Sequence, residues 1–323
     1  NGVVTGIDLA TDFESHPPVE LWRRPIGEGW SAFAIHGRHA VTQEQHEHEE
    51  RVVCYDVLTG DVLWSHADAA RYETTIAGVG PRATPTIQNG RVYTAGATGV
   101  LNCLDLETGE RIWSTNFLDT YGEPVPMWGF SGSPLVVDDR VVVNPGGKGH
   151  ALAAYNANTG EPIWTGGDDE ASYASPMIAT LAGVRQIVIF NHHSVAGHDI
   201  ATGELLWDHP WPAVNYSPAR SRDPKVTQPV VVPGDRLYVS SSYGVGAAML
   251  HVTRDGAGAW NVAVLYDNMN MKAKFTNLVY RDDHIYGLDE GTLACIDVET
   301  GGRVWKDGRY GRGQIILAGD TLL

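Results

Sequence analysis

The chain has 323 residues, with 39 acidic residues against 23 Lys and Arg and a formal net charge of −16. This acidic balance argues against nonspecific binding to nucleic acid and against docking on anionic lipid. No apolar stretch approaches the length of a membrane span, so the composition also argues against membrane insertion.

Two short apolar segments open the chain, residues 3–7 and 19–26, and we expect both to be strands. The pattern that follows recurs along the chain. A pair of strands joined by a short polar turn, as in residues 84–94 and 133–144, precedes a third and a fourth strand. No long segment shows the 3.6-residue periodicity of a helix, so the sequence predicts an all-β fold.

The third and fourth strands carry a repeated motif, Asp/Asn-x-x-Thr-Gly-x-x-x-Trp. Its Asp or Asn favours a turn through hydrogen bonds from its side chain to the backbone, and its Gly adopts a positive φ at little steric cost. The closing Trp offers a large apolar area to a neighbouring sheet. Five clean copies occupy residues 56–64, 105–113, 156–164, 199–207 and 297–305.

Two weaker copies end at Trp22 and Trp260, which brings the Trp-marked repeats to seven, 42 to 53 residues apart. This period fits a blade of four short strands and is too long for a leucine-rich or ankyrin unit. Radial repetition of such blades shields most strand edges. The sequence therefore predicts one β-propeller domain of four-stranded antiparallel blades over residues 1–323.

The two ends leave the number of blades open. The chain begins on what we expect to be the third and fourth strands of a blade and ends, at residues 314–323, on a first strand and the start of a second. If the two halves complete one blade, the propeller has seven. The end at Leu323, inside an apolar run, favours instead a truncated chain with an incomplete eighth blade.

The three cysteines, Cys54, Cys103 and Cys295, each lie two residues before a motif Asp, where other copies have Ala154 or Gly197. This position is a slot for small residues in the third strand. We expect buried thiols there with a packing role. Equivalent positions on different blades are too far apart for a disulfide.

The motif resembles the tryptophan-docking motif of the pyrroloquinoline quinone (PQQ) propeller superfamily. That superfamily includes quinoprotein alcohol dehydrogenases and a cofactor-free lipoprotein of the outer-membrane β-barrel assembly machinery. Four further segments look like the PQQ-like repeat proteins of planctomycetes, which usually form eight blades: residues 80–85, 128–134, 144–149 and 268–272.

The resemblance implies the fold more than the active site. Quinoprotein dehydrogenases carry a pair of adjacent cysteines beside the quinone, and here no two cysteines are adjacent. Their calcium ligands (a Glu, an Asn and an Asp) and their catalytic Asp have no counterparts that can be aligned in this chain.

In a propeller, the loops between the second and third strands and those between blades gather on one face. Several cations fall on these loops, and a ring of them would attract an anionic ligand such as a quinone tricarboxylate or a carboxylated glycan. The alternative is ordinary solvated loop charge. The candidate contacts for a cofactor or ligand are Arg82, Trp128, Lys148, Lys225, Lys272 and Lys274.

Histidines form the second set of candidates. His46 and His48 lie in the acidic segment 43–50, and His192 and His193 lie in an equivalent loop farther along the chain. Imidazole and carboxylate groups suit a transition metal. A solvated acidic loop is the competing interpretation, and two consecutive residues share one ion only where the chain turns.

Three functions compete. The first is a non-enzymatic binding or scaffold propeller of an extracytoplasmic bacterial assembly, with a protein or small anionic ligand on the loop face. The second is a PQQ-dependent oxidoreductase that uses calcium, and the third is a metal-dependent enzyme. The start at Asn1 without Met is typical of a processed periplasmic or secreted protein, and equally of a trimmed cytosolic chain.

Overall fold

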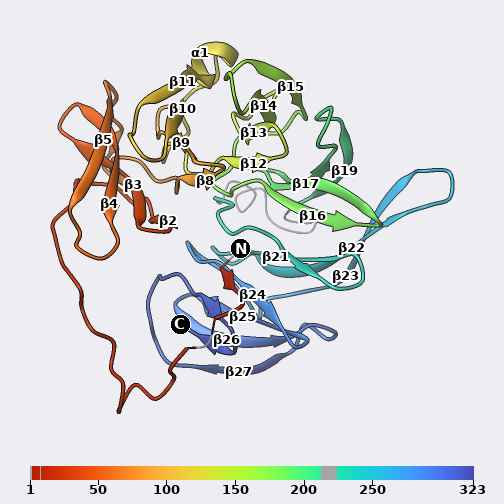
Figure 1. Ribbon diagram of the computed structural model, residues 1–323. Coiled ribbons are helices and arrows are strands. Elements are labelled where there is room, and N and C mark those ends of the chain that lie inside the picture. The colour runs from red at the N-terminus through yellow and green to blue at the C-terminus, as the bar shows by residue number, and fades with distance from the viewer. Residues whose placement is uncertain (1, 8, 212–223) are drawn as a thin grey trace. The chain divides into compact units, whose positions relative to one another are not determined.

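A computed structural model of the protein describes residues 2–7, 9–211 and 224–323 (Figure 1). It contains two compact units. Unit 1 comprises Asn1–Pro18, Met177–Ile200 and Glu204–Leu323, and unit 2 comprises Val19–Pro176 with Ala201–Gly203.

Unit 2 holds three antiparallel sheets, each of four strands in sequential order. The shorter elements of this unit are a two-stranded ribbon of β6 (Glu73–Thr74) and β7 (Gly78–Val79) and one helical turn, α1 (Phe117–Tyr121). The sheets are β2 (Ala34–His36), β3 (His39–His46), β4 (Glu49–Asp56) and β5 (Val62–Asp68); β8 (Thr86–Gln88), β9 (Arg91–Ala95), β10 (Val100–Asp105) and β11 (Arg111–Asn116); and β12 (Leu135–Val137), β13 (Arg140–Val143), β14 (Leu152–Asn156) and β15 (Pro162–Gly166).

In its described residues, unit 1 holds three more sheets of the same kind and a three-stranded sheet formed by the two ends of the chain. The four-stranded sheets are β16 (Met177–Leu181), β17 (Val184–Phe190), β18 (Ser194–His198) and β19 (Leu205–Pro210); β20 (Val230–Val232), β21 (Arg236–Ser241), β22 (Gly246–Arg254) and β23 (Trp260–Asn268); and β24 (Val279–Arg281), β25 (His284–Asp289), β26 (Thr292–Asp297) and β27 (Arg303–Asp307). The predicted all-β fold of four-stranded antiparallel sheets is thus confirmed, while the number of blades remains a prediction.

The chain ends share a sheet, but with a different pairing from the one a completed blade requires. β1 (Val3–Val4) runs parallel to β28 (Leu317–Ala318), which pairs antiparallel with β29 (Thr321–Leu322). The predicted strand at residues 19–26 is wrong, because no strand forms there. Pro17 and Pro18 precede this segment and Pro25 interrupts it, and prolines lack the N–H that a sheet ladder needs.

The motif turns form as predicted. Asp105 Oδ1 accepts the backbone N–H groups of Glu107 and Thr108 at 3.0 and 2.9 Å, and Gly109 has a φ of 72°. Asn156 makes the same pair of bonds at 2.8 and 3.1 Å. A β-bulge accompanies the motif between the third and fourth strands, as at Cys103/Leu104, and no sequence signal predicted it.

Each early motif Trp packs against the turn of the next repeat. Trp113 is 8% exposed, and its Nε1–H donates to Ala157 O at 3.0 Å. A Cβ on Gly160 would lie 2.7 Å from the Trp113 ring, so both the positive φ and the ring require glycine there. Trp64 makes the same contacts with Leu106 O and Gly109.

The later repeats depart from this scheme. Trp207 donates to Gln186 of its own sheet. Trp260 lies under the Arg254 guanidinium, and Tyr266 takes the equivalent place by donating its hydroxyl to Val298 O at 2.8 Å. The prediction that Trp260 occupies the motif Trp position is therefore wrong. The strand β23 is long, and Tyr266, farther along it, lies nearer the next turn. Trp305 is 41% exposed.

The three cysteines are buried and free, in β4, β10 and β26. Burial raises the pKa of Cys54 to about 12 and that of Cys103 to about 11. The predicted packing role of these thiols agrees with this environment. Among the described residues, no helix has the length and apolarity needed to span a bilayer.

Candidate functional site

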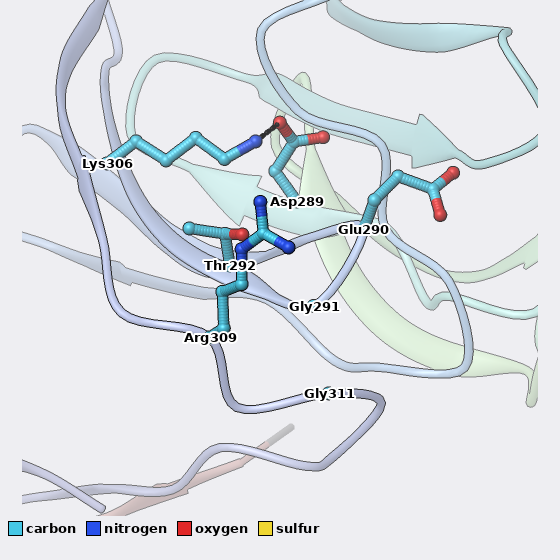
Figure 2. A pocket seen from close by; sticks show the side chains of 7 residues that line it. All are labelled: Asp289, Glu290, Gly291, Thr292, Lys306, Arg309 and Gly311. Carbon is cyan, nitrogen blue, oxygen red and sulfur yellow. Dashed lines mark hydrogen bonds and ion pairs between the residues drawn. The ribbon is translucent and has the colours of Figure 1, made fainter.

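Unit 1 contains a cavity of about 350 Å³ at one end of the sheet β24–β27. Its walls are the turn between β25 and β26, the end of β27 and the loop that follows (Figure 2). Most of the lining residues are charged or small: Asp289, Glu290, Gly291, Thr292, Lys306, Arg309 and Gly311.

The centre of this pocket is a carboxylate held by two lysines. Asp289 is 1% exposed, and its Oδ1 lies 2.6 Å from Lys272 Nζ and accepts the Lys272 backbone N–H at 2.9 Å. Its Oδ2 pairs with Lys306 Nζ. Such pairing compensates the cost of burying the charge, and it leaves the carboxylate with donors on both oxygens.

Backbone bonds hold the three loops of the pocket together. Glu290 N donates to Lys272 O at 3.2 Å, and Tyr310 N donates to Gly291 O at 2.8 Å. Gly291 has a φ of 90°, and a Cβ there would lie 2.9 Å from Gly311 O. The loops therefore approach more closely than a larger residue at position 291 would allow.

The remaining charged groups face solvent. Figure 2 shows the Arg309 guanidinium beside Thr292, in the space between Lys306 and Glu290. Among the described residues, Arg309 makes no hydrogen bond or ion pair. The Glu290 carboxylate accepts a hydrogen bond from the Ser242 hydroxyl.

Unit 2 contains a second cluster, centred on a buried acid. Burial raises the pKa of Glu50 to about 7, although the N–H of Ala97 donates to its Oε1 at 3.0 Å and favours the charged form. The neighbouring Asp68 carboxylate raises that pKa further, and the Arg82 guanidinium lowers it. Glu50 therefore gains and loses a proton near neutral pH.

Two of the predicted ligand contacts, Arg82 and Trp128, border this second cluster. Arg82 lies over the Tyr72 ring at 4.6 Å from the centroid and donates to Ala77 O at 2.7 Å. Trp128 packs on Tyr173 with a centroid distance of 5.1 Å. Arg82 is thus engaged by its own loop, and both residues remain predictions as ligand contacts.

The four predicted lysines have different settings. Lys272 belongs to the pocket of unit 1, and Lys274 in the same loop lies over the Tyr243 ring at 4.1 Å. Lys148 is exposed and makes no hydrogen bond or ion pair within the described part of the chain. Lys225 is fully buried, and its role as a ligand contact remains a prediction.

The predicted histidine ligands are placed as follows. His46 Nε2 lies 2.9 Å from Glu44 Oε2, an oxygen that also accepts the Gly27 N–H. His48 is exposed in the β3–β4 turn, and neither His46 nor His48 joins a set of three potential metal ligands among the described residues. His192 and His193 pack edge to face at 4.6 Å between β17 and β18. Metal binding stays a prediction.

Lys272, which the sequence predicts on a loop of the propeller face, contacts Asp289 of the β25–β26 turn through its side chain and its backbone. Sequence reasoning missed Lys306, Arg309 and Glu50 as site residues. Lys306 directly follows the motif residue Trp305, and Arg309 lies just after the end of β27. Both are distant from Asp289 in sequence, and only the pairing of the strands brings them near it. The signal for Glu50 was its place beside the apolar run 52–55 of β4, although the surrounding acidic segment concealed it.

The comparisons with known proteins agree with the repeated four-stranded sheets of this fold. The family described as "Outer membrane protein assembly factor BamB", a PQQ-type repeat family, matches residues 48–307. A solved structure of BamB from Moraxella catarrhalis covers 91% of this chain and 77% of its own, with a TM-score of 0.61 at 16% identity. At this identity the likeness concerns the fold alone.

Curated relatives match shorter stretches. Quinohemoprotein alcohol dehydrogenase ADH IIB of Pseudomonas putida is 29% identical over 148 residues, 41% of this chain and 20% of that protein. BamB of Xanthomonas campestris is 35% identical over 86 residues, 27% of this chain and 19% of its own length. The matched stretches thus span about a fifth of these relatives.

The family match covers most of the chain and agrees with the repeated motif and with the four-stranded sheets. This chain therefore belongs to the BamB-type family of PQQ-like β-propeller repeat proteins.

Proposed function

We propose that this chain is a non-enzymatic binding protein of an extracytoplasmic bacterial assembly, periplasmic or secreted, with its ligand or partner on the loops. The observation that carries the proposal is the state of Asp289. This carboxylate is 1% exposed and is held between two ammonium groups and a backbone N–H, so neither of its oxygens is presented to a substrate as a base.

The chain also matches quinohemoprotein alcohol dehydrogenases, which makes PQQ with calcium the cofactor to test. The residues of the unit 1 pocket do not fit PQQ with calcium. Calcium takes six to eight oxygen ligands, whereas both Asp289 oxygens already accept lysine donors. The three cysteines are not adjacent in sequence, and each is buried in a different sheet.

A quinone titration tests the proposal. Protein stripped of metal is titrated with PQQ, with and without Ca²⁺, while tryptophan fluorescence and dye-linked alcohol oxidation are followed. A binding protein shows no quinone-dependent turnover. Saturable quenching accompanied by turnover would support the oxidoreductase alternative, which the dehydrogenase relatives favour.

The metal-dependent alternative rests on His46, His48, His192 and His193. Elemental analysis of the purified protein distinguishes it. A stoichiometric transition metal that is lost on replacing His192 and His193 by Ala would favour the metal enzyme over the binding protein.

A further inference from the structure

The pocket of unit 1 has a surplus of positive charge inside an acidic protein. Two cations, Lys306 and Arg309, and two acids, Asp289 and Glu290, line the pocket, and Lys272 adds a third cation behind it by pairing with Asp289. These five groups together carry one net positive charge. The chain as a whole carries −16. An anion approaching this protein is therefore repelled by most of the surface and attracted at this place.

The two lysine ammonium groups are both engaged by the buried Asp289 carboxylate. The cation that remains unpaired is Arg309, which is exposed and makes no hydrogen bond or ion pair with the residues that the structure describes. The hydroxyl of the half-buried Thr292 likewise has no partner among those residues. A guanidinium fork and a hydroxyl thus line the same small cavity (Figure 2).

The surroundings hold these groups in place. The Tyr310 N–H donates to Gly291 O at 2.8 Å and fixes the residue next to Arg309 against the β25–β26 turn, which precedes Thr292. The Asp289–Lys306 pair fixes the opposite wall. Little of the pocket has to reorganise when a ligand enters, which favours affinity.

We propose that this pocket binds a carboxylate group, with Arg309 as a bidentate donor and with Thr292 and Lys306 as further donors. A planar carboxylate matches the guanidinium fork. Its single negative charge matches the single surplus charge, whereas a phosphate dianion would leave excess negative charge beside Glu290. The proposal deepens the binding function above and rests on it.

The carboxylate can come from a free organic acid or from the end of a peptide chain, and one titration distinguishes the two. Equilibrium dialysis at low, fixed ionic strength measures the binding of labelled propionate, of its uncharged analogue propionamide and of inorganic phosphate. A tripeptide of small apolar residues is compared as the free acid and as the C-terminal amide. Tighter binding of the peptide acid than of propionate identifies a chain terminus, and equal affinities identify a free acid.

The variant that tests the site is Arg309→Gln, which keeps a polar side chain at an exposed position. We expect saturable propionate binding to weaken at least tenfold in this variant, and several-fold in Thr292→Val. Arg303→Gln is the matched control. This exposed arginine of β27 lies outside the pocket lining, and its replacement also removes one positive charge. It should change the affinity by less than twofold.

Three outcomes would overturn the proposal: propionamide binding as well as propionate, phosphate binding more tightly than propionate, or Arg303→Gln and Arg309→Gln weakening binding equally. Thermal melts confirm that each variant is folded. Dialysis contains no quinone, so failure of this pocket is separable from failure of the proposed function, which is decided by dye-linked turnover.

Discussion

At the scale of single residues, the motif tryptophans differ in how much they stabilise the fold. Trp113 is 8% exposed, and its ring packs against Gly160 of the next turn. Trp113→Ala should therefore lower the free energy of unfolding by about 3–5 kcal/mol, through lost burial and the cavity left behind. Urea denaturation followed by circular dichroism measures the loss.

Trp305→Ala is the matched control, because the Trp305 ring is 41% exposed. We expect this substitution to cost less than half as much as the loss of Trp113. Equal losses in the two variants would contradict the packing role assigned to the buried ring.

Glu50 predicts a pH dependence that opposes ordinary acid denaturation. Its pKa is raised to about 7 by burial, so the folded state resists losing the proton that the unfolded chain releases near pH 4.3. Its contribution to stability is greatest below pH 4.3 and decreases as the pH rises through 7. This difference in pKa between the folded and unfolded states corresponds to about 4 kcal/mol at most.

Glu50→Gln should remove this dependence while retaining an oxygen acceptor for the Ala97 N–H. The difference in unfolding free energy between the variant and the wild type should grow from pH 4 to pH 8 in favour of the variant. Urea melts across this range, with Glu110→Gln as a control at an exposed glutamate, measure it. A constant difference would show that Glu50 titrates normally.

At the scale of elements, the motif turn contributes a stability that changes with pH in the opposite direction to that of Glu50. Hydrogen bonds from the Thr108 backbone N–H lower the pKa of Asp105, against the effect of burial. The stability that they provide is present above about pH 4 and is lost as the pH falls through the folded-state pKa. Asp105→Asn should keep the turn but flatten the acid limb of the stability curve.

Asn156 already shows that an amide oxygen makes the same two backbone contacts. Asp105→Ala, which removes both contacts, should instead cost about 1 kcal/mol at pH 7 and less at pH 3. Urea midpoints at pH 3 and pH 7 measure both effects. An acid limb unchanged in Asp105→Asn would mean that other carboxylates dominate it.

Local patterns predicted the elements well, because hairpins and motif turns depend on neighbouring residues. They failed where distant residues decide. The assignment of Trp260 as a repeat mark was wrong because Tyr266, six residues farther along β23, reaches Val298 of the next sheet. The predicted strand at 19–26 has no partner strand, and pairing is a tertiary property.

The residues of the candidate site also fall into two groups, those that local sequence patterns could place and those that depend on distant contacts. Lys272 could be placed on the loop face from the repeat pattern alone. Arg309 could not, because its position depends on a backbone bond between Tyr310 and Gly291. The absence of an ion pair at Arg309 among the described residues is likewise visible only when its neighbours are known.

At the scale of the whole molecule, charge is distributed unevenly. Seven of the 23 basic residues fall within positions 272–312, and five of these lie on the pocket and the adjoining loops: Lys272, Lys274, Lys306, Arg309 and Arg312. Attraction between exposed charges is screened over about 10 Å at 0.1 M salt. We expect anion binding at this surface to weaken as NaCl is raised, and a salt-independent affinity in dialysis would contradict an electrostatic site.

The three cysteines test whether residues 1–323 behave as one domain. Cys54 and Cys103 lie in unit 2 and Cys295 in unit 1, and all three are buried. Unit 2 includes Ala201–Gly203, the turn between two strands of unit 1, and a Cβ on Gly203 would lie 2.3 Å from the Trp164 ring. A chain interleaved in this way should unfold as one cooperative structure.

We therefore expect no thiol to react with a disulfide reagent in native buffer, since only an exposed thiolate is reactive. All three thiols should become reactive over the same range of urea concentration. Single Cys→Ala variants assign each labelling event, and mass spectrometry reads the modified peptides. Reaction of Cys295 at a urea concentration that still protects Cys54 and Cys103 would mean that the two units unfold separately, and that the single-domain prediction is wrong.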